Sequence, residues 1–388
     1  MSLPLEDIRV LDLSRLLPGP FCTLTLADFG ADVIKVEDPN VGDYSRWMEP
    51  TVNGQSPMFL SLNRNKRSVT LDLKSEKGKK LFKQLVETAD ILVESFRPGV
   101  MERLGLGYEA IKEINPQLIY CAITGYGQTG PYSQYPGHDI NYLSYAGVLG
   151  QQGEQEGKPV SSAVQIADIG GGAQMATNGI LLALFERYKS GKGQFIDISM
   201  LDGSLSWLQT VLPNFLATKE ESERGQSVLN GGRACYEVYE TKDARYLSVG
   251  ALEPKFWVEF CKTIEREDLI PHLEAPLLQQ NKMKVEIQTI IQQRTLQEWL
   301  DLFDGVDACV APILNFGEVI DNPQVVHRQL IKEIYDPNLG KIQQIGIPIK
   351  LSNTPGEIRS QAPALGQHNK DILAELGYSA EEIKELSL

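Results

Sequence analysis

The chain has 388 residues, of which 42% are hydrophobic and 23% are charged, which is the composition of an ordinary globular protein. A chain of this length is expected to form two or three domains. Its 51 acidic and 37 basic residues give a net charge of -14, which disfavours non-specific binding to nucleic acid or to an anionic membrane.

Membrane insertion and cysteine chemistry are both disfavoured. The chain has no run of about 18 apolar residues and begins without the basic and apolar regions of a signal peptide. We therefore expect a cytoplasmic protein with no membrane partner. Its cysteines are far apart and form no CxxC pair, which indicates neither a disulfide framework nor a cysteine zinc site. We expect all five to be reduced core residues: Cys22, Cys121, Cys235, Cys261 and Cys309.

The first forty residues predict a strand, a helix and a second strand. Residues 8–13 form an apolar run, residues 23–29 have a helical pattern that Gly30 ends, and residues 32–37 form another apolar run. This order is typical of the opening of an α/β sheet. A dinucleotide-binding site would need GxGxxG between the first strand and its helix, but residues 14–23 contain a single glycine. A nicotinamide dehydrogenase is therefore excluded.

The same alternation continues along the chain. Apolar runs at 68–73, 89–96 and 118–126 are separated by helical patterns at 77–89 and 107–116. Strands that alternate with helices indicate a mostly parallel sheet. The predicted fold class is therefore α/β, with a Rossmann-like large domain.

A second domain is predicted after a polar linker. A long helix is expected from about Gly171 to Lys189, followed by a strand at 194–200. Residues 236–252 then predict a hairpin, and residues 254–266 and 295–304 predict amphipathic helices. These patterns indicate a smaller α+β domain. The expected division is a large domain at 1–200 completed by 330–388, a linker at 201–225 and a small domain at 226–325.

Asp168 lies just before three glycines that lead into the long helix. Because Gly170, Gly171 and Gly172 have no side chains, a ligand carbonyl oxygen could approach the unpaired N–H groups at the positive end of the helix. An equally good interpretation is that Asp168 caps the helix and the glycines pack it against the sheet. The residues themselves leave both interpretations open.

His138 and Glu253 are weaker candidates. His138 lies in a turn after a glycine, among Tyr, Asp and Asn residues, where a catalytic histidine or a loop histidine bonded to a backbone carbonyl would both fit. Glu253 lies between a predicted strand and Pro254, at the start of a predicted helix, where acidic residues are common.

A basic cluster could hold a phosphate-bearing ligand, although its lysines are also typical of a solvated helix face. Its members are Arg64, Lys66, Arg67, Lys74, Lys77, Lys79, Lys80, Arg97 and Arg103.

Over nearly its whole length the sequence resembles the class III CoA-transferase superfamily, also called the CaiB/BaiF family. The segments that carry the resemblance are residues 9–38, 42–46, 63–74, 90–108, 123–132, 183–203 and 365–383. Within the superfamily, GHDINY around His138, ADIGGG around Asp168 and GALEPKFW around Glu253 look like the α-methylacyl-CoA racemase branch.

The resemblance implies a reaction and a set of roles. His138 and Asp168 would be the two acid/base groups, and Glu253 would hydrogen-bond to His138. The reaction would interconvert (R)- and (S)-2-methylacyl-CoA thioesters by 1,1-proton transfer through an enolate, with no metal and no cofactor beyond the CoA moiety of the substrate. The family also implies an interlocked homodimer.

The resemblance further implies which residues contact CoA. Lys35 stands where some relatives have arginine, and lysine keeps the charge but loses the bidentate geometry. The implied contacts are Lys35, Leu71, Asp72, Leu73, Lys74, Ser95, Phe96, Arg97 and Arg103 for the adenine and phosphates, and Gly137, Asp139, Asn141 and Tyr142 for the pantetheine and thioester.

Two other functions fit the same residues. In a class III CoA transferase, Asp168 would be a nucleophile that forms an aspartyl-CoA thioester, and His138 would not be needed. A non-catalytic acyl-CoA-binding protein would need neither residue. The acyl chain is not determined by the sequence, and its apolar contacts could include Met175, Met200, Trp207 and Trp257.

Overall fold

The computed structural model describes residues 2–336 and 339–386, which form two compact units. The first unit contains the chain through Ala146, then Ala163–Trp207, and then the C-terminal part from Val326 onward. It contains the predicted parallel sheet. That CoA binds to this unit stays a prediction.

The second unit contains Gly147–Ser162 and Leu208–Val325. The first of these segments was expected in the large domain. The expected linker contains a helix, α10 (Leu212–Thr218), within the second unit. The compact units therefore divide the chain at other residues than the sequence analysis proposed.

The sheet of the first unit has six parallel strands in the order β3-β2-β1-β4-β5-β6. Leu11 of β1 is in register with Ile34 of β2 on one side and with Leu92 of β4 on the other. Chain order reverses between β1 and β4, and ligands of such sheets bind beyond the carboxyl ends of the strands at this reversal. The α/β fold with a parallel sheet is confirmed. The strands are β1 (Arg9–Asp12), β2 (Asp32–Glu37), β3 (Lys66–Thr70), β4 (Ile91–Glu94), β5 (Ile119–Thr124) and β6 (Phe195–Ser199).

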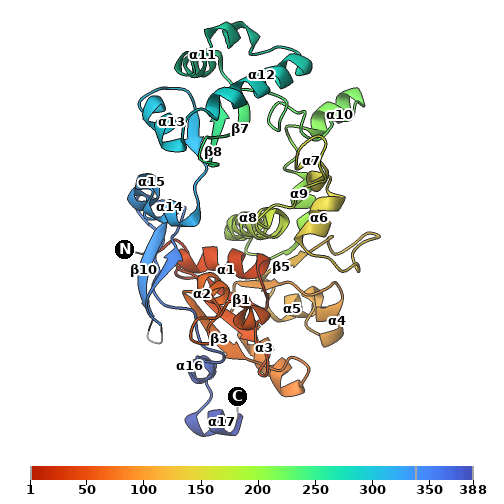
Figure 1. The fold of residues 1–388 in the computed structure, drawn as a ribbon. Helices are drawn as coiled ribbons and strands as arrows, with labels where there is room; N and C mark the ends of the chain where they lie inside the picture. The colour runs from red at the N-terminus through yellow and green to blue at the C-terminus, as the bar shows by residue number, and fades with distance from the viewer. Residues whose placement is uncertain (1, 337–338, 387–388) are drawn as a thin grey trace. The chain divides into compact units, whose positions relative to one another are not determined.

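Helices cover both faces of this sheet because both faces of its strands are apolar. Leu11 and Ile34 join one buried cluster with residues of α3, α5 and α16, whereas the neighbouring Val10 and Val33 are also fully buried but lie outside this cluster. Figure 1 shows α1 and α8 on one side of the sheet and α3 and α16 on the other. These helices are α1 (Pro18–Asp28), α3 (Glu76–Glu87), α5 (Tyr108–Ile114), α8 (Met175–Ser190) and α16 (Asn369–Glu375).

The long helix predicted from Gly171 begins earlier. Residues Ile166–Gln174 form a π-helix, η2, that continues directly into α8. Gly191 ends α8 in the left-handed conformation, with φ of 69°, as a C-terminal glycine often does. Asp168 and the glycines after it therefore lie inside the helical segment rather than before it.

The free edge of β3 is covered by the C-terminal part of the chain, which prevents pairing with another strand. The amide of Asn65 donates to the carbonyl of Ser360, and the amide of His368 donates to the carbonyl of Ser68. The other elements of this unit are η1 (Tyr44–Trp47), α2 (Pro57–Asn63), α4 (Val100–Leu104), α6 (Asp139–Tyr145), α9 (Met200–Leu205), β10 (Ile331–Asp336), β11 (Gly340–Ile345) and α17 (Ala380–Leu386).

The second unit is built around a three-stranded antiparallel sheet, and its β7–β8 pair confirms the predicted hairpin. Its core contains Trp257, Phe260, Trp299 and Phe303, with the rings of Trp257 and Phe260 stacked at 5.5 Å. Its elements include α7 (Val148–Gln151), α10, β7 (Tyr236–Glu240), β8 (Tyr246–Gly250), α11 (Pro254–Thr263), η3 (Glu267–His272), α12 (Leu277–Ile291), α13 (Leu296–Phe303), β9 (Val310–Pro312) and α14 (Phe316–Asp321); α15 (Pro323–His327) follows at the boundary between the units.

The cysteines differ from the expectation at one position. All five are free, and four are buried, but Cys309 is exposed, because it precedes the short strand β9 at the surface of the second unit. Within the described ranges, no helix is both long enough and apolar enough to span a bilayer.

Candidate functional site

A cavity of about 560 Å³ lies at the carboxyl ends of β1, β4 and β5, beside the reversal of strand order. Both His138 and Asp168 line it. The two residues are 30 positions apart in the sequence, but α6 and η2 pack against each other and bring them to one site. Most of the remaining walls come from the ends of these three strands and the segments that follow them, whereas Tyr44 belongs to η1 and Met200 to α9. The remaining lining residues are Arg15, Leu16, Pro18, Tyr44, Ser95, Phe96, Arg97, Pro98, Ile123, Thr124, Gly125, Tyr126, Ser133, Tyr135, Pro136, Gly137, Tyr142 and Met200.

A second cavity of about 300 Å³ adjoins the first. Arg15 and Phe96 line both cavities, so the two are adjacent at the edge of the sheet, and we call them together the groove. Leu71, Leu73 and Lys74, which were predicted to contact CoA, line the second cavity. The predicted contacts Ser95, Phe96, Arg97, Gly137 and Tyr142 line the first.

His138 precedes the first residue of α6 and presents an exposed side chain. Its backbone amide donates to Oδ1 of Asn141 at 3.1 Å, and its carbonyl accepts from the amide of Asn141 at 2.8 Å. These bonds fix the backbone of His138 at the helix start. Asn141 therefore positions His138 and is not itself among the residues that line the cavity.

Asp168 is half-buried, and burial together with the negative charge of Asp139 raises the pKa of its carboxyl to about 7. Asp139 turns its own carboxylate toward the start of η2, where Oδ1 accepts from the amides of Ala167 at 2.7 Å and Asp168 at 3.1 Å. Asp139, rather than Asp168, therefore caps this helical segment. Its predicted contact with pantetheine stays a prediction.

The three glycines after Asp168 have a packing explanation. A β-carbon at Gly170 would lie 2.6 Å from the ring of Trp207, and one at Gly171 would lie 2.6 Å from the carbonyl oxygen of Met200. A β-carbon at Gly172 would lie 2.9 Å from Met200 Cγ. The glycines therefore let η2 approach α9 and Trp207, whereas the packing interpretation of the sequence had named the sheet as the partner.

Tyrosine rings form the wall beside His138. The Tyr126 ring lies 5.2 Å from Tyr142 and 6.5 Å from Tyr135, in both cases at an interplanar angle of 84°. The Tyr142 hydroxyl donates to the carbonyl of Gly137 at 2.5 Å, and burial and the nearby Asp168 raise its pKa. A β-carbon at Gly137 would lie 2.6 Å from the Tyr142 ring, so this position needs glycine.

The sequence analysis missed Arg15. Its guanidinium lies 5.1 Å from the centroids of both the Tyr44 and the Phe96 rings, and it donates to the Tyr44 hydroxyl at 3.1 Å. Arg15 is thereby held where the two cavities join. The available signal was its position three residues after β1, the strand at which the sheet order reverses.

Lys35 was predicted to contact a phosphate of CoA, but the structure buries its side chain beside carboxylates. Its side chain is 1% exposed, and its amino group lies 2.8 Å from Asp43 and 2.9 Å from the carbonyl of Ser14. Burial alone would lower the pKa of Lys35, but the carboxylates of Asp12 and Asp43 raise it. Lys35 is therefore enclosed with the buried carboxylates of Asp12 and Asp43. Lys35 therefore has a structural role in the first unit.

Other members of the basic cluster also have protein partners. Arg64 pairs with Asp28 at 2.7 Å and Lys66 with Asp12 at 3.1 Å, while Arg67 binds both Asp32 and Glu375. Arg103 is exposed in the last turn of α4 and lines neither part of the groove.

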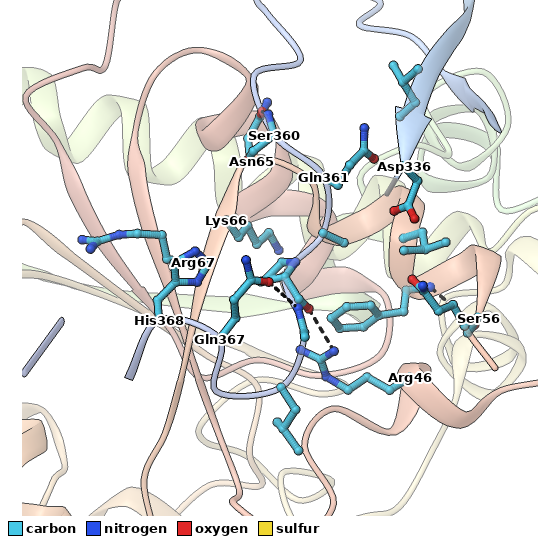
Figure 2. Close-up of a pocket in the computed structure, with 18 of the residues that line it drawn as sticks. Arg46, Ser56, Asn65, Lys66, Arg67, Asp336, Ser360, Gln361, Gln367 and His368 are labelled. Atoms are coloured by element: carbon cyan, nitrogen blue, oxygen red, sulfur yellow. Dashed lines mark hydrogen bonds between the residues drawn. The ribbon is translucent and has the colours of Figure 1, made fainter. Parts of the chain in front are cut away.

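Another cavity, of about 880 Å³, lies elsewhere in the first unit (Figure 2). Figure 2 shows Arg46 directed to the chain segment beside Gln367, where it donates to the carbonyl of Pro363 at 3.0 Å. Arg46 also pairs with Glu37, and the Lys66 and Arg67 labelled in the same view bind carboxylates. Because these cations already have partners, this cavity is a weaker candidate than the groove.

Glu253 belongs to the second unit, at the start of α11, and is exposed. Burial and the carboxylate of Glu253 raise the pKa of the Cys309 thiol, so these two residues are neighbours. The bond between Glu253 and His138 stays a prediction.

Of the expected acyl contacts, Met200 lines the cavity, whereas Trp257 is 1% exposed in the core of the second unit.

Comparison with known proteins was consistent with the resemblance. A family model described as CoA-transferase family III matches residues 5–369. The human succinyl-CoA:glutarate CoA-transferase is 38% identical over 99% of this chain and 88% of its own length. The human alpha-methylacyl-CoA racemase is 37% identical over 99% of this chain and 96% of its own length. A CAIB/BAIF family protein from Brucella suis has a similar structure, with a TM-score of 0.85, 31% identity and coverage of 97% of this chain and 100% of that one.

Proposed function

The chain belongs to CoA-transferase family III, and from this premise we propose that it is a 2-methylacyl-CoA racemase. The observation that carries the proposal is that His138 and Asp168 line one cavity at the carboxyl edge of the sheet. A transferase of this family needs the aspartate, but it has no use for a second base at the α-carbon.

The proposed chemistry begins with the acidity of the α-hydrogen. The thioester stabilises the carbanion as an enolate, so one group can remove the α-proton while another returns a proton to the opposite face. The pKa of Asp168, raised to about 7, lets this carboxyl accept or donate a proton near neutral pH. His138 in its neutral or protonated form is the complementary partner.

The groove is the proposed CoA site. The adenine and phosphates lie along the second cavity beside Leu71, Leu73 and Lys74, and the pantetheine passes Arg15 and Phe96 toward Asp168. Two observations support this path: the cavities share Arg15 and Phe96, and Arg15 and Lys74 supply positive charge to an otherwise acidic protein. No cofactor other than the CoA moiety of the substrate is needed for this chemistry.

The alternative is a CoA transferase, because the chain is as similar to the human glutarate transferase, at 38% identity, as to the human racemase, at 37%. A carboxylate oxygen of Asp168 would attack the thioester carbonyl, and the C–S bond would break to release CoA thiolate. The thiolate would then attack the aspartyl carbonyl of the resulting anhydride. The acyl group would leave as a carboxylate, and an aspartyl-CoA thioester would remain to transfer CoA to an acceptor.

One assay distinguishes the racemase from the CoA transferase. Purified protein is incubated in deuterium oxide with (S)-2-methylacyl-CoA, with and without succinate or glutarate as an acceptor. The racemase proposal predicts solvent deuterium at the α-carbon and formation of the (R) thioester without an acceptor. Formation of succinyl-CoA or glutaryl-CoA with an unlabelled α-carbon would contradict it and favour the transferase.

A homodimer is part of the proposal, and the interlocked arrangement follows from the family resemblance alone. Support for a second copy comes from α8, whose outer side exposes Leu182 at 72%, Phe185 at 64% and Tyr188 at 91%. An apolar helix face of this kind is typical of a protein interface. Sedimentation equilibrium tests it: a dimer is expected, and a monomer at micromolar concentration would contradict it. The cytoplasmic location stays a prediction.

A further inference from the structure

Thr124 is a buried polar residue of the site that the proposed mechanism does not yet use. It ends β5, is 6% exposed and lines the cavity that contains His138 and Asp168. Its hydroxyl oxygen is buried and has no hydrogen-bond partner among the described residues. A buried hydroxyl without a partner destabilises a fold, because it has lost its bonds to water without replacement. Such a group in a cavity wall indicates a partner supplied by a ligand.

The chemistry of the site requires a donor of this kind. When the α-proton leaves, negative charge develops on the thioester oxygen, and a donor aimed at this oxygen lowers the barrier. The start of η2 does not supply it, because the amides of Ala167 and Asp168 already donate to Asp139. The Tyr142 hydroxyl is also committed, since it donates to a backbone carbonyl.

We propose that the Thr124 hydroxyl donates a hydrogen bond to the thioester oxygen of the acyl-CoA substrate and stabilises the enolate. The inference rests on the proposed function. In the step concerned, the α-C–H bond breaks, its proton moves to His138 or Asp168, and its electron pair moves through the C–C bond to the thioester oxygen. Thr124 keeps its own proton throughout and binds more strongly as the oxygen becomes negative.

The test compares Thr124→Val, which removes the hydroxyl at nearly constant shape, with Thr124→Ser, which keeps it. Thr124→Val is expected to lower kcat for α-hydrogen exchange by about 10- to 100-fold, while the Kd for the acyl-CoA changes by less than about threefold. Thr124→Ser is expected to stay within about threefold of the wild-type kcat. Because Thr124→Val removes an unpartnered hydroxyl, the Tm of the free protein is expected to stay constant or rise.

Thr23→Val is the matched control. Thr23 is also buried in the first unit, but its hydroxyl donates to Asp12 at 2.7 Å and accepts from Lys66 at 2.8 Å. The same substitution there breaks satisfied bonds, so its Tm should fall. A Tm that stays constant or rises in Thr124→Val but falls in Thr23→Val would distinguish a hydroxyl that is free to bind substrate from one that stabilises the fold.

Several outcomes would overturn the assignment: a Thr124→Val kcat within twofold of the wild type, a loss confined to KM, or equal losses in the valine and serine variants. The wild type measured in parallel separates this failure from failure of the proposed function. If the wild type transfers CoA without α-exchange, the racemase proposal fails. The oxyanion of acyl transfer then forms on the same oxygen, and the Thr124 variants are compared by their transfer kcat. If the wild type catalyses neither reaction, both proposals fail.

Discussion

Two groups of ionisable side chains lie near the same sheet and have opposite surroundings. In the first, Asp12 binds Lys66 at 3.1 Å and lies 3.9 Å from Lys35, and all three side chains are at most 1% exposed. In the second, His138 is exposed and Asp168 is half-buried, and both line an open cavity. Burial with partners indicates a role in the fold, whereas partial burial without a cationic partner leaves a carboxyl available for chemistry.

The two carboxyls show this contrast in their pKa values. Burial would raise both, but Lys35 and Lys66 overcome it at Asp12 and hold that pKa well below its usual range. At Asp168 no cation opposes burial, and the charge of Asp139 adds to it, so the pKa rises to about 7. The pKa values of Asp12 and Asp168 therefore differ because Asp12 has cations beside it and Asp168 does not.

Asp168→Asn should have the largest effect. Both proposed reactions need this carboxyl, so kcat should fall by about 1,000-fold or more, while CoA binding, measured by calorimetry, changes little. His138→Ala is the companion variant, because it should remove racemisation but leave any CoA transfer intact. An Asp168→Asn protein that retained more than a tenth of the wild-type kcat for racemisation or CoA transfer would contradict a catalytic role for Asp168.

The stability of the two carboxyl variants should change in opposite directions. Asp12→Asn leaves buried cations without their partner and should lower the free energy of unfolding by about 3 kcal/mol or more. Asp168→Asn should raise this free energy at pH 8 by about 2 to 4 kcal/mol, since ionisation of Asp168 is unfavourable in the folded state. Urea unfolding of both variants measures these changes. A loss of stability in Asp168→Asn at pH 8 would contradict the account.

The free energy of unfolding should depend on pH in opposite ways through these two carboxyls. The unfolded state releases the Asp168 proton near pH 4 and the folded state near pH 7, so this group lowers stability as pH rises between these values. Asp12 acts oppositely, because its stabilising contribution is present above its unfolded pKa and is lost as pH falls. In Asp168→Asn the decrease between pH 4 and pH 7 should become smaller, whereas an unchanged slope would exclude Asp168 as its source.

Glu253→Gln should have a smaller effect, of about tenfold on kcat. By the family resemblance, the role of Glu253 is to orient the His138 ring. Glu259→Gln on the same helix is a suitable control, since Glu259 pairs with Lys262 at 2.9 Å. Equal effects of the two substitutions would indicate general damage to the second unit.

Much of the fold could be predicted from the sequence because its strands are continuous apolar runs and its turns contain glycine and proline. Residues 32–37 were predicted as a strand and form β2. The burial of Lys35 within that strand could not be predicted, because its partner Asp43 is a matter of tertiary structure. A lysine in an apolar strand predicts a buried ion pair only when the residue that pairs with it is already known.

The site was predictable in part for the same reason. His138 and Asp168 were candidates from their local sequence, the family pattern supplied their roles, and the structure brings them to one cavity. The role of Asp139 was missed because capping across 28 residues has no local signature. Thr124 was missed because an unpartnered hydroxyl is visible only after every nearby donor and acceptor has been assigned.

The most direct test of two-base catalysis follows label into each enantiomer separately. Wild-type protein in deuterium oxide is supplied with (R)- or (S)-2-methylacyl-CoA, and early time points are analysed by mass spectrometry after chiral separation. We expect deuterium first in the inverted product, and we expect His138→Ala and Asp168→Asn each to exchange the α-hydrogen of one enantiomer only, opposite for the two variants. Exchange of both enantiomers by either variant, or exchange by neither, would contradict the account.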